Sequence, residues 1–458
     1  MHTLITDLQQ AVSSPVLTGA DISAKYQHDW SAEAPGIPVA VVRPSSTDEV
    51  AAIMRVCSAA NQPVVVQGGL SGLCGGGNPR ANEVAISLER LQGIEEIDQA
   101  SMTMTVKAGT PLQVIQEAAD KAGCIFPLDL GARGTCNIGG NIATNAGGNQ
   151  VVRFGMTRNL VLGLEAVLAD GTVITSLNKM LKNNAGYDLK HLFIGTEGTL
   201  GIVTRAVLRL FPKAKSRCSA LVAVNDFPSV IKLLQQLSRD CGSSMSAFEV
   251  MWHSYYHFIT DNCKGITSPF TQRYPLYVLT ELEGSDPDKD QALFESTLSA
   301  AMEQGLVVDA AIASSQRERE GFWKIRDGVG EIGPFIKNSA NFDVSVPISS
   351  MQLFLESIDR ELQAALPACK MLVFGHIADS NLHFIGYTGR KEDVKQIYSV
   401  VYRTVGEYHG SVSAEHGVGV QKLAYLHYSR TEQELALMRT LKQTMDPKAI
   451  LNPGRVLP

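Results

Sequence analysis

The sequence predicts a mixed helix-and-strand protein, α/β or α+β, with two or three domains, and three observations lead to this prediction. The chain has 458 residues, enough for several separately packed cores. It is 45% hydrophobic and 19% charged, as a globular protein is, and it contains 40 glycines. Short strand patterns alternate with amphipathic helix patterns up to about residue 210, and beyond it the sequence pattern and the glycine content change.

The N-terminal part has clear signals for individual elements. Residues 45–62 predict a helix that begins with a capping box formed by Ser46 and Glu49. The next stretch, PVVVQ at 63–67, predicts a buried strand that runs into a glycine-rich loop.

Further along, residues 109–123 predict a second helix, with Thr110 as its N-cap and Pro111 in its first turn. Residues 162–176 predict a β-hairpin, because an Asp-Gly pair stands between two apolar runs.

The glycine content and the pattern of predicted elements change near residue 215. Glycine becomes less frequent, and amphipathic stretches such as SVIKLLQQLSRD (229–240) alternate with strand patterns such as YPLYVLTELEG (274–284). We therefore expect a domain boundary near 215. Glycine and histidine return together at GSVSAEHGVG (410–419), which marks a third section of the chain.

Charge and composition exclude several classes of partner. A net charge of −6 and a pI near 6.0 predict no nucleic-acid partner. The sequence has no signal-peptide pattern and no apolar run long enough for a transmembrane helix. Its eight cysteines form no C-x-x-C pair, which favours free thiols in a reducing compartment. We expect a cytoplasmic protein, with peripheral attachment at the inner membrane left open.

Three glycine-rich segments follow apolar stretches: QGGLSGLCGGG (67–77), NIGGNIATNAGG (137–148) and GTEGTLGIVT (195–204). Glycine lets backbone N–H groups come close to an anion, as a phosphate site requires. Three such segments in one domain favour a long ligand such as a dinucleotide, although flexible turns are an alternative. One G-x-G-x-x-G match, at 328–333, follows no convincing strand, and we interpret it as a coincidence.

FGHIADSNLHF (374–384) contains two histidines seven positions apart. The residues between them favour a turn, so we predict a hairpin that turns at Asp379 and Ser380 and sets His376 directly across from His383. The alternative is that both are ordinary, partly buried histidines of a sheet.

Taken together, these segments resemble the FAD-dependent D-2-hydroxyacid dehydrogenases of the vanillyl-alcohol-oxidase flavoprotein superfamily. That group includes D-lactate and D-2-hydroxyglutarate dehydrogenases and the glycolate oxidase flavoprotein subunit. LKNNAGYDLKHLFIG (181–195), SAEHGVG (413–419) and DPKAILNPGRV (446–456) extend the resemblance over nearly the whole chain.

The resemblance implies an α+β fold with three sections. They are a two-subdomain FAD-binding domain of the vanillyl-alcohol-oxidase type (1–214), an α+β substrate or cap domain with an antiparallel sheet (215–411), and a C-terminal segment that returns to the flavin and metal site (412–458). Members that attach the flavin covalently through the first loop have a histidine where this chain has Leu70, so we expect non-covalent FAD. The implied flavin contacts are Gly68, Gly69, Ser71, Gly72, Asp129, Gly139, Gly140, Thr144, Asn145, Gly147, Gly148, Gly198, Ile202 and Asn452.

The resemblance also implies a divalent metal, zinc or manganese, bound by His376, His383 and Glu415. Two imidazoles and one carboxylate form a recurring open metal site, in which the cation helps a substrate hydroxyl to lose its proton. Neighbouring side chains of an extended segment point in opposite directions, so His416 is left to act as the catalytic base. Hydride would then pass to N5 of the flavin, and the electrons to a non-NAD acceptor.

Substrate contacts are implied at Arg326, which occupies the family's carboxylate-binding position, and at Asn381. A surface arginine on a helix is the alternative for Arg326. Members that act on hydroxyglutarate have a threonine, a lysine and an asparagine where this chain has Gly330, Asn341 and Ile385. Without a cationic partner a buried distal carboxylate is costly, which favours a monocarboxylic D-2-hydroxy acid such as D-lactate or a longer apolar homologue.

Several alternatives stay open from the sequence. They are a D-2-hydroxyglutarate or D-malate dehydrogenase, an oxygen-using oxidase, and a non-flavin enzyme with a two-histidine, one-glutamate metal site. The expected acceptor is a quinone, an electron-transfer flavoprotein or a cytochrome, and a homodimer is left open.

Overall fold

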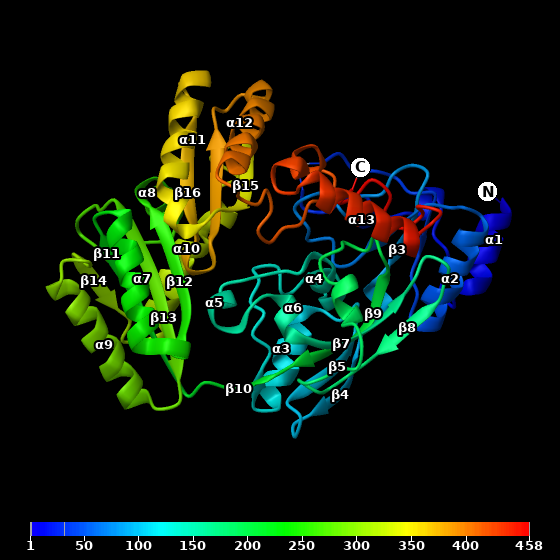
Figure 1. Cartoon of the computed structure of the whole chain (residues 1–458), viewed down its shortest axis with the longest axis horizontal. Coiled ribbons are helices and arrows are strands. Elements are labelled where there is room, and N and C mark those ends of the chain that lie inside the picture. Colours follow the sequence, from blue (N-terminus) through cyan, green and yellow to red (C-terminus); the bar gives the residue numbers. More distant parts are fainter. Residues whose placement is uncertain (1, 32, 458) are drawn as a thin grey trace. The chain divides into compact units, whose positions relative to one another are not determined.

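The computed structural model describes residues 2–31 and 33–457. They form two compact units (Figure 1). The first unit contains residues 1–148, 154–213 and 415–458, and the second contains 149–153 and 214–414. The short helix α5 (Val151–Phe154) lies where the chain passes from one unit to the other.

The first unit contains two main sheets. The parallel sheet has the order β1 (Ala40–Val42), β3 (Val84–Ser87), β2 (Val64–Gln67). The antiparallel sheet has the order β4 (Ile94–Asp98), β5 (Thr103–Lys107), β9 (Ile202–Arg209), β7 (Val161–Val167), β8 (Val173–Ser176). A further pair joins β6 (Cys124–Ile125) to β10 (Phe211–Pro212). One hydrophobic core contains residues from both main sheets.

Six helices also belong to the described part of the first unit: α1 (His2–Ala11), α2 (Thr47–Ala59), α3 (Leu112–Lys121), α4 (Ile138–Thr144), α6 (Thr157–Leu160) and α13 (Glu432–Met445). The two predicted helices form, but their caps differ from the prediction. The Ser46 side chain caps α2, whereas Glu49 bonds Ser45 and not the Ser46 amide, so the capping box is half correct. Thr110 is not the cap of α3, because its hydroxyl bonds the carbonyls of Lys107 and Gly93 instead.

The second unit is built on one antiparallel sheet of seven strands. Their order is β14 (Asp309–Ile312), β11 (Ser216–Val224), β13 (Leu276–Gly284), β12 (Met245–Trp252), β16 (Lys370–His376), β17 (Asn381–Tyr387), β15 (Ser339–Ser345). Its helices are α7 (Phe227–Cys241), α8 (His253–Asn262), α9 (Pro287–Glu303), α10 (Gln316–Arg326), α11 (Met351–Ala365) and α12 (Val394–Glu407).

One face of this sheet packs against α8 and α10. Residues of these helices share a hydrophobic cluster with Met251 of β12, Phe374 of β16 and Ile385 of β17. Because side chains alternate along a strand, the strand register decides which residues face these helices. The 328–333 segment lies in a 3₁₀ turn (Asp327–Glu331) and the residues just after it, and the turn follows α10, so no strand precedes it as a dinucleotide fingerprint requires.

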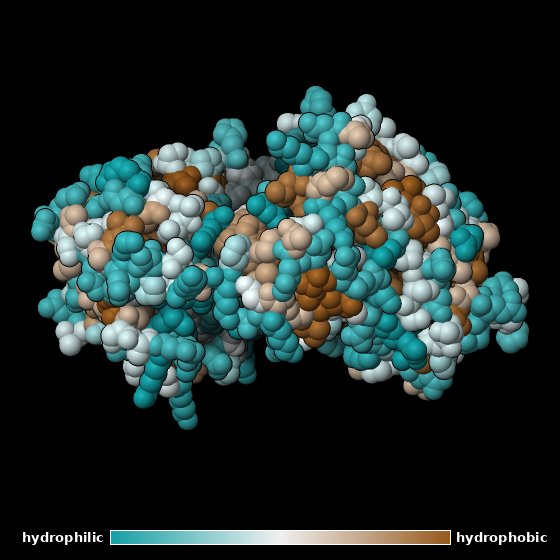
Figure 2. Space-filling view, turned by 90° about the horizontal axis from the view of Figure 1, so that it is seen from below, coloured by the Kyte–Doolittle hydropathy of each residue, from teal (hydrophilic) through white to brown (hydrophobic). Residues whose placement is uncertain are grey.

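No helix within the described residues is long and apolar enough to cross a membrane. On the face drawn in Figure 2, hydrophobic residues form several separate groups among hydrophilic ones. None of the eight cysteines, which all lie within the described residues, forms a disulfide, and all are buried.

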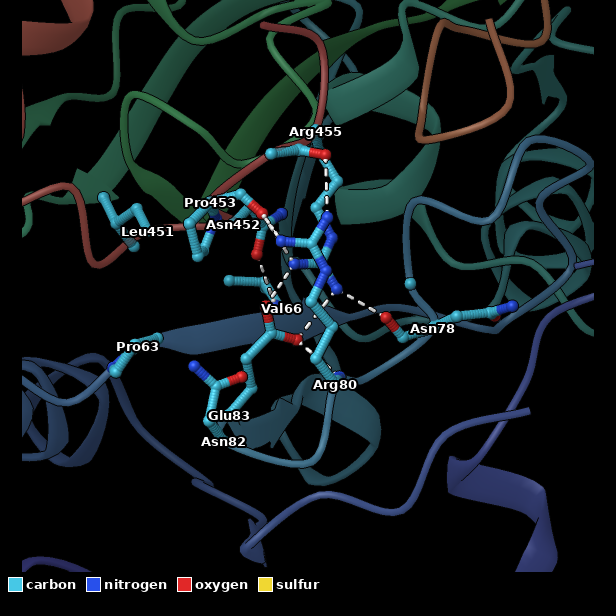
Figure 3. A network of polar contacts seen from close by, with 12 residues as sticks. Pro63, Val66, Asn78, Arg80, Asn82, Glu83, Leu451, Asn452, Pro453 and Arg455 are labelled. Carbon is cyan, nitrogen blue, oxygen red and sulfur yellow. Dashed lines mark hydrogen bonds and ion pairs between the residues drawn. The ribbon is translucent and has the colours of Figure 1, made fainter. Parts of the chain in front are cut away.

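The C-terminal residues are held firmly in the first unit. Leu451 forms a parallel bridge with Val64 of β2, and the Asn452 side chain accepts a hydrogen bond from the Val66 amide at 2.8 Å. The fully buried Arg455 guanidinium pairs with the Glu83 carboxylate and donates to the Asn78 carbonyl (Figure 3). A buried ion pair therefore ties the end of the chain to the parallel sheet.

Replacing Arg455 by methionine leaves the Glu83 carboxylate buried without its cation. We expect the free energy of unfolding of the protein to fall by about 3–5 kcal/mol, measured by urea denaturation. The double variant Glu83→Gln/Arg455→Met should recover most of this loss. The exposed pair of Arg439 with Glu432 is the control, and Arg439→Met should change stability by no more than about 0.5 kcal/mol. If Arg455→Met and the double variant lost the same free energy of unfolding, this explanation would be contradicted.

Candidate active site

The histidine hairpin forms as predicted, but its register differs. Strands β16 and β17 pair so that Phe374, not His376, is opposite His383. The turn is centred one residue earlier than predicted, because Ile377–Asp379 form a 3₁₀ turn that Ser380 closes with a positive φ of 71°. His376 and His383 are therefore diagonal neighbours on one face, with ring centroids 5.3 Å apart and ring nitrogens within 4.8 Å of each other.

The register brings further polar residues to the same face of the sheet. Glu249 of β12 pairs with His376, and Asp343 of β15 pairs with His383. All four of these side chains are at most 9% exposed. A cluster of buried acids and imidazoles thus stands beside the apolar residues that pack against α8 and α10.

Arg326, the last residue of α10, reaches into this cluster. Its Nε donates to Glu249 Oε2 at 2.7 Å, and its Nη2 lies 3.0 Å from His376 Nε2. The other oxygen of Glu249 lies 2.6 Å from His376 Nδ1. Arg326 is 6% exposed, so the alternative of a surface arginine is wrong. Burial alone would raise the pKa of Glu249, but His376 and Arg326 outweigh burial and lower it.

Two side chains of the hairpin have buried polar atoms without a partner among the described residues. Both amide atoms of Asn381 and one carboxylate oxygen of Asp379 are in this state. Buried polar groups in proteins almost always have a partner, so an unpaired amide beside two histidines is a natural place for a polar ligand. Burial raises the pKa of Asp379 to about 6.

The glycine-rich segments converge within the first unit. An added Cβ at Gly69 would overlap the Thr135 carbonyl, and one at Gly148 would overlap the Asp129 carbonyl. Gly139 donates its amide to the Ala108 carbonyl at 2.7 Å. These glycines let backbones approach more closely than any side chain would permit.

The third glycine segment joins the other two. The amides of Gly195 and Glu197 donate to carbonyls of Ile142 and Ala143 in α4. An added Cβ at Gly198 would lie 2.9 Å from the Asn452 side-chain nitrogen, which donates to the Glu197 carbonyl at 2.6 Å. Residues from all three segments and the C-terminal segment, each predicted as a flavin contact, therefore lie in one region of this unit.

The first glycine loop has the donors that a phosphate needs. In the part of the chain that the structure describes, the N–H groups of Gly69, Leu70, Ser71 and Gly72 have no hydrogen-bond partner. Leu70 has a positive φ of 52°, which turns the backbone within this loop. Consecutive unpaired amides in a glycine-rich turn form a concave site for an anion, so these residues fit the pyrophosphate of a dinucleotide.

Glu197 holds the loop that contains the predicted base. Its carboxylate accepts hydrogen bonds from the amides of Val418 and Gly419, at 2.6 and 2.9 Å. Burial raises the pKa of Glu197, and these two amides lower it again in part. In the same unit, an added Cβ at Gly147 would overlap the Glu415 carboxylate. Glu415 and His416 therefore belong to a segment fixed against the glycine-rich loops.

Comparison with known proteins decides the family. Residues 213–456, more than half of the chain, match the family described as "FAD linked oxidases, C-terminal domain", and residues 38–176 match "FAD binding domain". The chain belongs to the FAD-linked oxidases. The predicted family resemblance, the α+β fold class and the FAD cofactor are confirmed, and this FAD-linked oxidase is an oxidoreductase.

Two curated relatives of this FAD-linked oxidase have the name D-2-hydroxyglutarate dehydrogenase. The chain is 39% identical over 448 residues to a "Probable D-2-hydroxyglutarate dehydrogenase, mitochondrial" of Oryza sativa subsp. indica, and the match covers 97% of this chain and 80% of the relative. It is 37% identical to the D-2-hydroxyglutarate dehydrogenase of Xanthomonas citri pv. viticola, covering 99% and 96%. Among solved structures, p-cresol methylhydroxylase has the same fold, with a TM-score of 0.79 at 15% identity over 99% of this chain and 96% of the other.

Sequence reasoning missed three acids: Glu249 and Asp343, which are buried, and Glu197, which is partly buried. The signal for Glu249 was a lone acid in the apolar run AFEVMW (247–252), since a buried strand tolerates a charge only beside a partner. Asp343 stands in a similar run, NFDVSV (341–346).

The close contact at Gly69 predicts weaker cofactor binding when a methyl group is added. We expect Gly69→Ala to weaken FAD binding by about 1–3 kcal/mol, roughly 5- to 150-fold, because the first loop must move away from Thr135. The measurement is the ratio of flavin to protein after gel filtration, with circular dichroism to show that the variant is folded. Gly321→Ala is the matched control, since an added Cβ there meets no atom within 4 Å. A normal flavin ratio in folded Gly69→Ala would contradict the assignment of this loop.

Proposed function

We propose that this FAD-linked oxidase oxidises a D-2-hydroxy acid to the 2-oxo acid and passes the electrons to an acceptor other than NAD. The observation that carries the proposal is the pair of adjacent imidazoles, His376 and His383, with the buried Arg326 beside them. Relatives named D-2-hydroxyglutarate dehydrogenase support the reaction class. FAD, when bound, supplies the oxidant for the carbon–hydrogen bond.

In this proposal His376, His383 and Glu415 hold a zinc or manganese ion, which polarises the substrate's oxygens. Two imidazoles and a carboxylate suit either metal. Support for Glu415 comes from the chain itself. The amide of Ala414 donates to the carbonyl of Asp343, the residue opposite His383, at 3.2 Å, and Glu415 is the next residue.

The remaining roles follow from charge and hydrogen-bonding capacity. Arg326 would bind the substrate carboxylate through its terminal nitrogens while Glu249 keeps hold of Nε. Asn381 would bond the substrate through its unpaired amide. His416 would accept the hydroxyl proton, and the loop fixed by Glu197 would keep it in place.

The residues beside His383 favour an apolar substrate side chain. Ile385 lies two positions along β17 on the same face and packs with Ile332 and Ile336. Asn341, which pairs with Ile385, is exposed, and a Cβ on Gly330 would meet no atom within 4 Å. We therefore propose a monocarboxylic substrate such as D-lactate or a longer homologue. D-2-Hydroxyglutarate is the second candidate, because the named relatives act on it.

A panel of D- and L-2-hydroxy acids assayed with an artificial electron acceptor tests the proposal. We expect kcat/KM to be highest for an apolar D-monocarboxylate and about 10-fold or more lower for D-2-hydroxyglutarate and for L-isomers. Treatment with a chelator should stop turnover, and added zinc or manganese should restore it. A preference for D-2-hydroxyglutarate would overturn the monocarboxylic assignment, and full activity after exhaustive chelation would overturn the metal.

His416→Ala separates chemistry from cofactor binding. We expect rapid mixing with substrate to show flavin reduction slowed at least about 100-fold, because a general base contributes roughly 10²–10⁴-fold. The bound flavin per protein should be unchanged. His427→Ala, on the 3₁₀ helix Leu423–Tyr428 of the same unit, is the control and should reduce flavin at the normal rate. Near-normal reduction in His416→Ala would remove His416 from the mechanism.

A further inference from the structure

Glu249 has contacts that no assigned role explains. It stands in the interior of β12, its side chain is 1% exposed, and it touches two of the residues proposed for the reaction. One oxygen lies 2.6 Å from His376 Nδ1, and the other accepts from Arg326 Nε at 2.7 Å. Both oxygens are thus used, each by a different partner on a different element.

These contacts determine which nitrogen of His376 has the proton. A carboxylate that accepts a short hydrogen bond from a guanidinium is ionised, so it can only accept from its second partner. His376 Nδ1 must therefore be protonated. Nε2 then has the lone pair, in agreement with its position 3.0 Å from the Arg326 Nη2 donor. A neutral histidine with this tautomer can bind a cation through Nε2 only.

We propose that Glu249 is a positioning residue of the reaction. It fixes His376 as the Nδ1–H tautomer, so that the Nε2 lone pair, which accepts from Arg326 Nη2 in the metal-free protein, is the one that an ion would bind in place of that contact. It also holds Arg326 through Nε, which leaves Nη1, and Nη2 once the ion has replaced it at Nε2, for the substrate carboxylate. An acid that orients a ligating histidine typically changes metal affinity 10- to 100-fold when it is removed. The inference rests on the proposed function, because the ion is part of that proposal.

A purely structural ion pair is the competing explanation, and the chain offers a matched control for it. Glu283 in the neighbouring β13 is also 1% exposed and pairs with Arg153 and Arg217 within the second unit. Glu283→Gln removes a buried acid from the same sheet without touching a histidine. Both substitutions are expected to lower stability, but only Glu249→Gln should alter His376.

The first experiment needs no metal. With ¹⁵N-labelled histidine in the FAD-loaded, chelator-treated protein, NMR should show a His376 signal of the Nδ1–H tautomer, assigned by its loss in His376→Gln. In Glu249→Gln this signal should move toward the Nε2–H tautomer. Glu283→Gln should keep the parent signal, and Glu249→Asp should recover it in part. Two outcomes overturn the inference, whether or not a metal binds. One is that His376 of the parent is the Nε2–H tautomer, and the other is that His376 has the same tautomer in Glu249→Gln as in the parent.

The second experiment measures zinc chloride and manganese chloride binding by competition with a chromophoric chelator. We expect Glu249→Gln to bind about 10- to 100-fold more weakly than the parent, with unchanged FAD content, and Glu283→Gln to bind normally. Equal affinity in Glu249→Gln and the parent would overturn the role toward the ion. If the parent binds neither metal while its His376 is the Nδ1–H tautomer, the proposed metal function fails and the role of Glu249 in orienting His376 stands.

Discussion

A carboxylate that is 1% exposed stays ionised only beside partners that compensate for its lost hydration, and Glu249 has two of them. Arg326 and His376 each bond one of its oxygens, and neither is near in sequence to β12. The three residues come together because β12 pairs with β16 and because α10 packs on the same face of the sheet. Without this buried acid, the only carboxylate paired with the Arg326 guanidinium among the described residues would be the exposed Asp327, 3.7 Å from Nη1.

The rest of the candidate site depends on this arrangement through the alternation of side chains along a strand. Once His376 faces Glu249, the register of β16 and β17 puts His383 and Ile385 on the same face. Polar residues then gather at one part of the face and apolar ones at the other. The same alternation that builds the core of the second unit therefore determines which groups can meet a substrate.

Local signals explain most of what the sequence could predict. The glycine segments, the hairpin and the helices over 47–59 and 112–121 were predictable because turn formers and apolar periodicity act over a few residues. The hairpin register was wrong because Asp379, Ser380 and their neighbours all favour turns, and composition alone does not set the turn's centre. The Thr110 cap was wrong because a threonine can bond several nearby backbone groups.

Tertiary contacts explain why some residues of the candidate site could not be predicted from the sequence. Glu249, Glu197 and Asp343 are acids whose partners lie on elements far away in the chain, so no short window identifies them. Glu83 belongs to the same class, since its cation, Arg455, is 372 residues away. A lone acid in an apolar strand pattern predicts that a partner exists, although it does not predict which one.

The path of the chain holds the predicted residues Glu415 and His416 within the first unit. This unit ends one of its segments at Gly148 and begins another at Glu415, and Gly147 lies against the Glu415 carboxylate. The returning segment is then held by Glu197 at 418–419 and by the Arg455 pair near its end. Each of the two anchoring acids, the buried Glu83 and the partly buried Glu197, accepts several hydrogen bonds. Glu415 and His416 are therefore held by the folded domain and not left on a free tail. In the proposed mechanism this segment presents a carboxylate and a base, and such anchoring would fix their positions, since catalytic geometry tolerates errors of only about half an ångström.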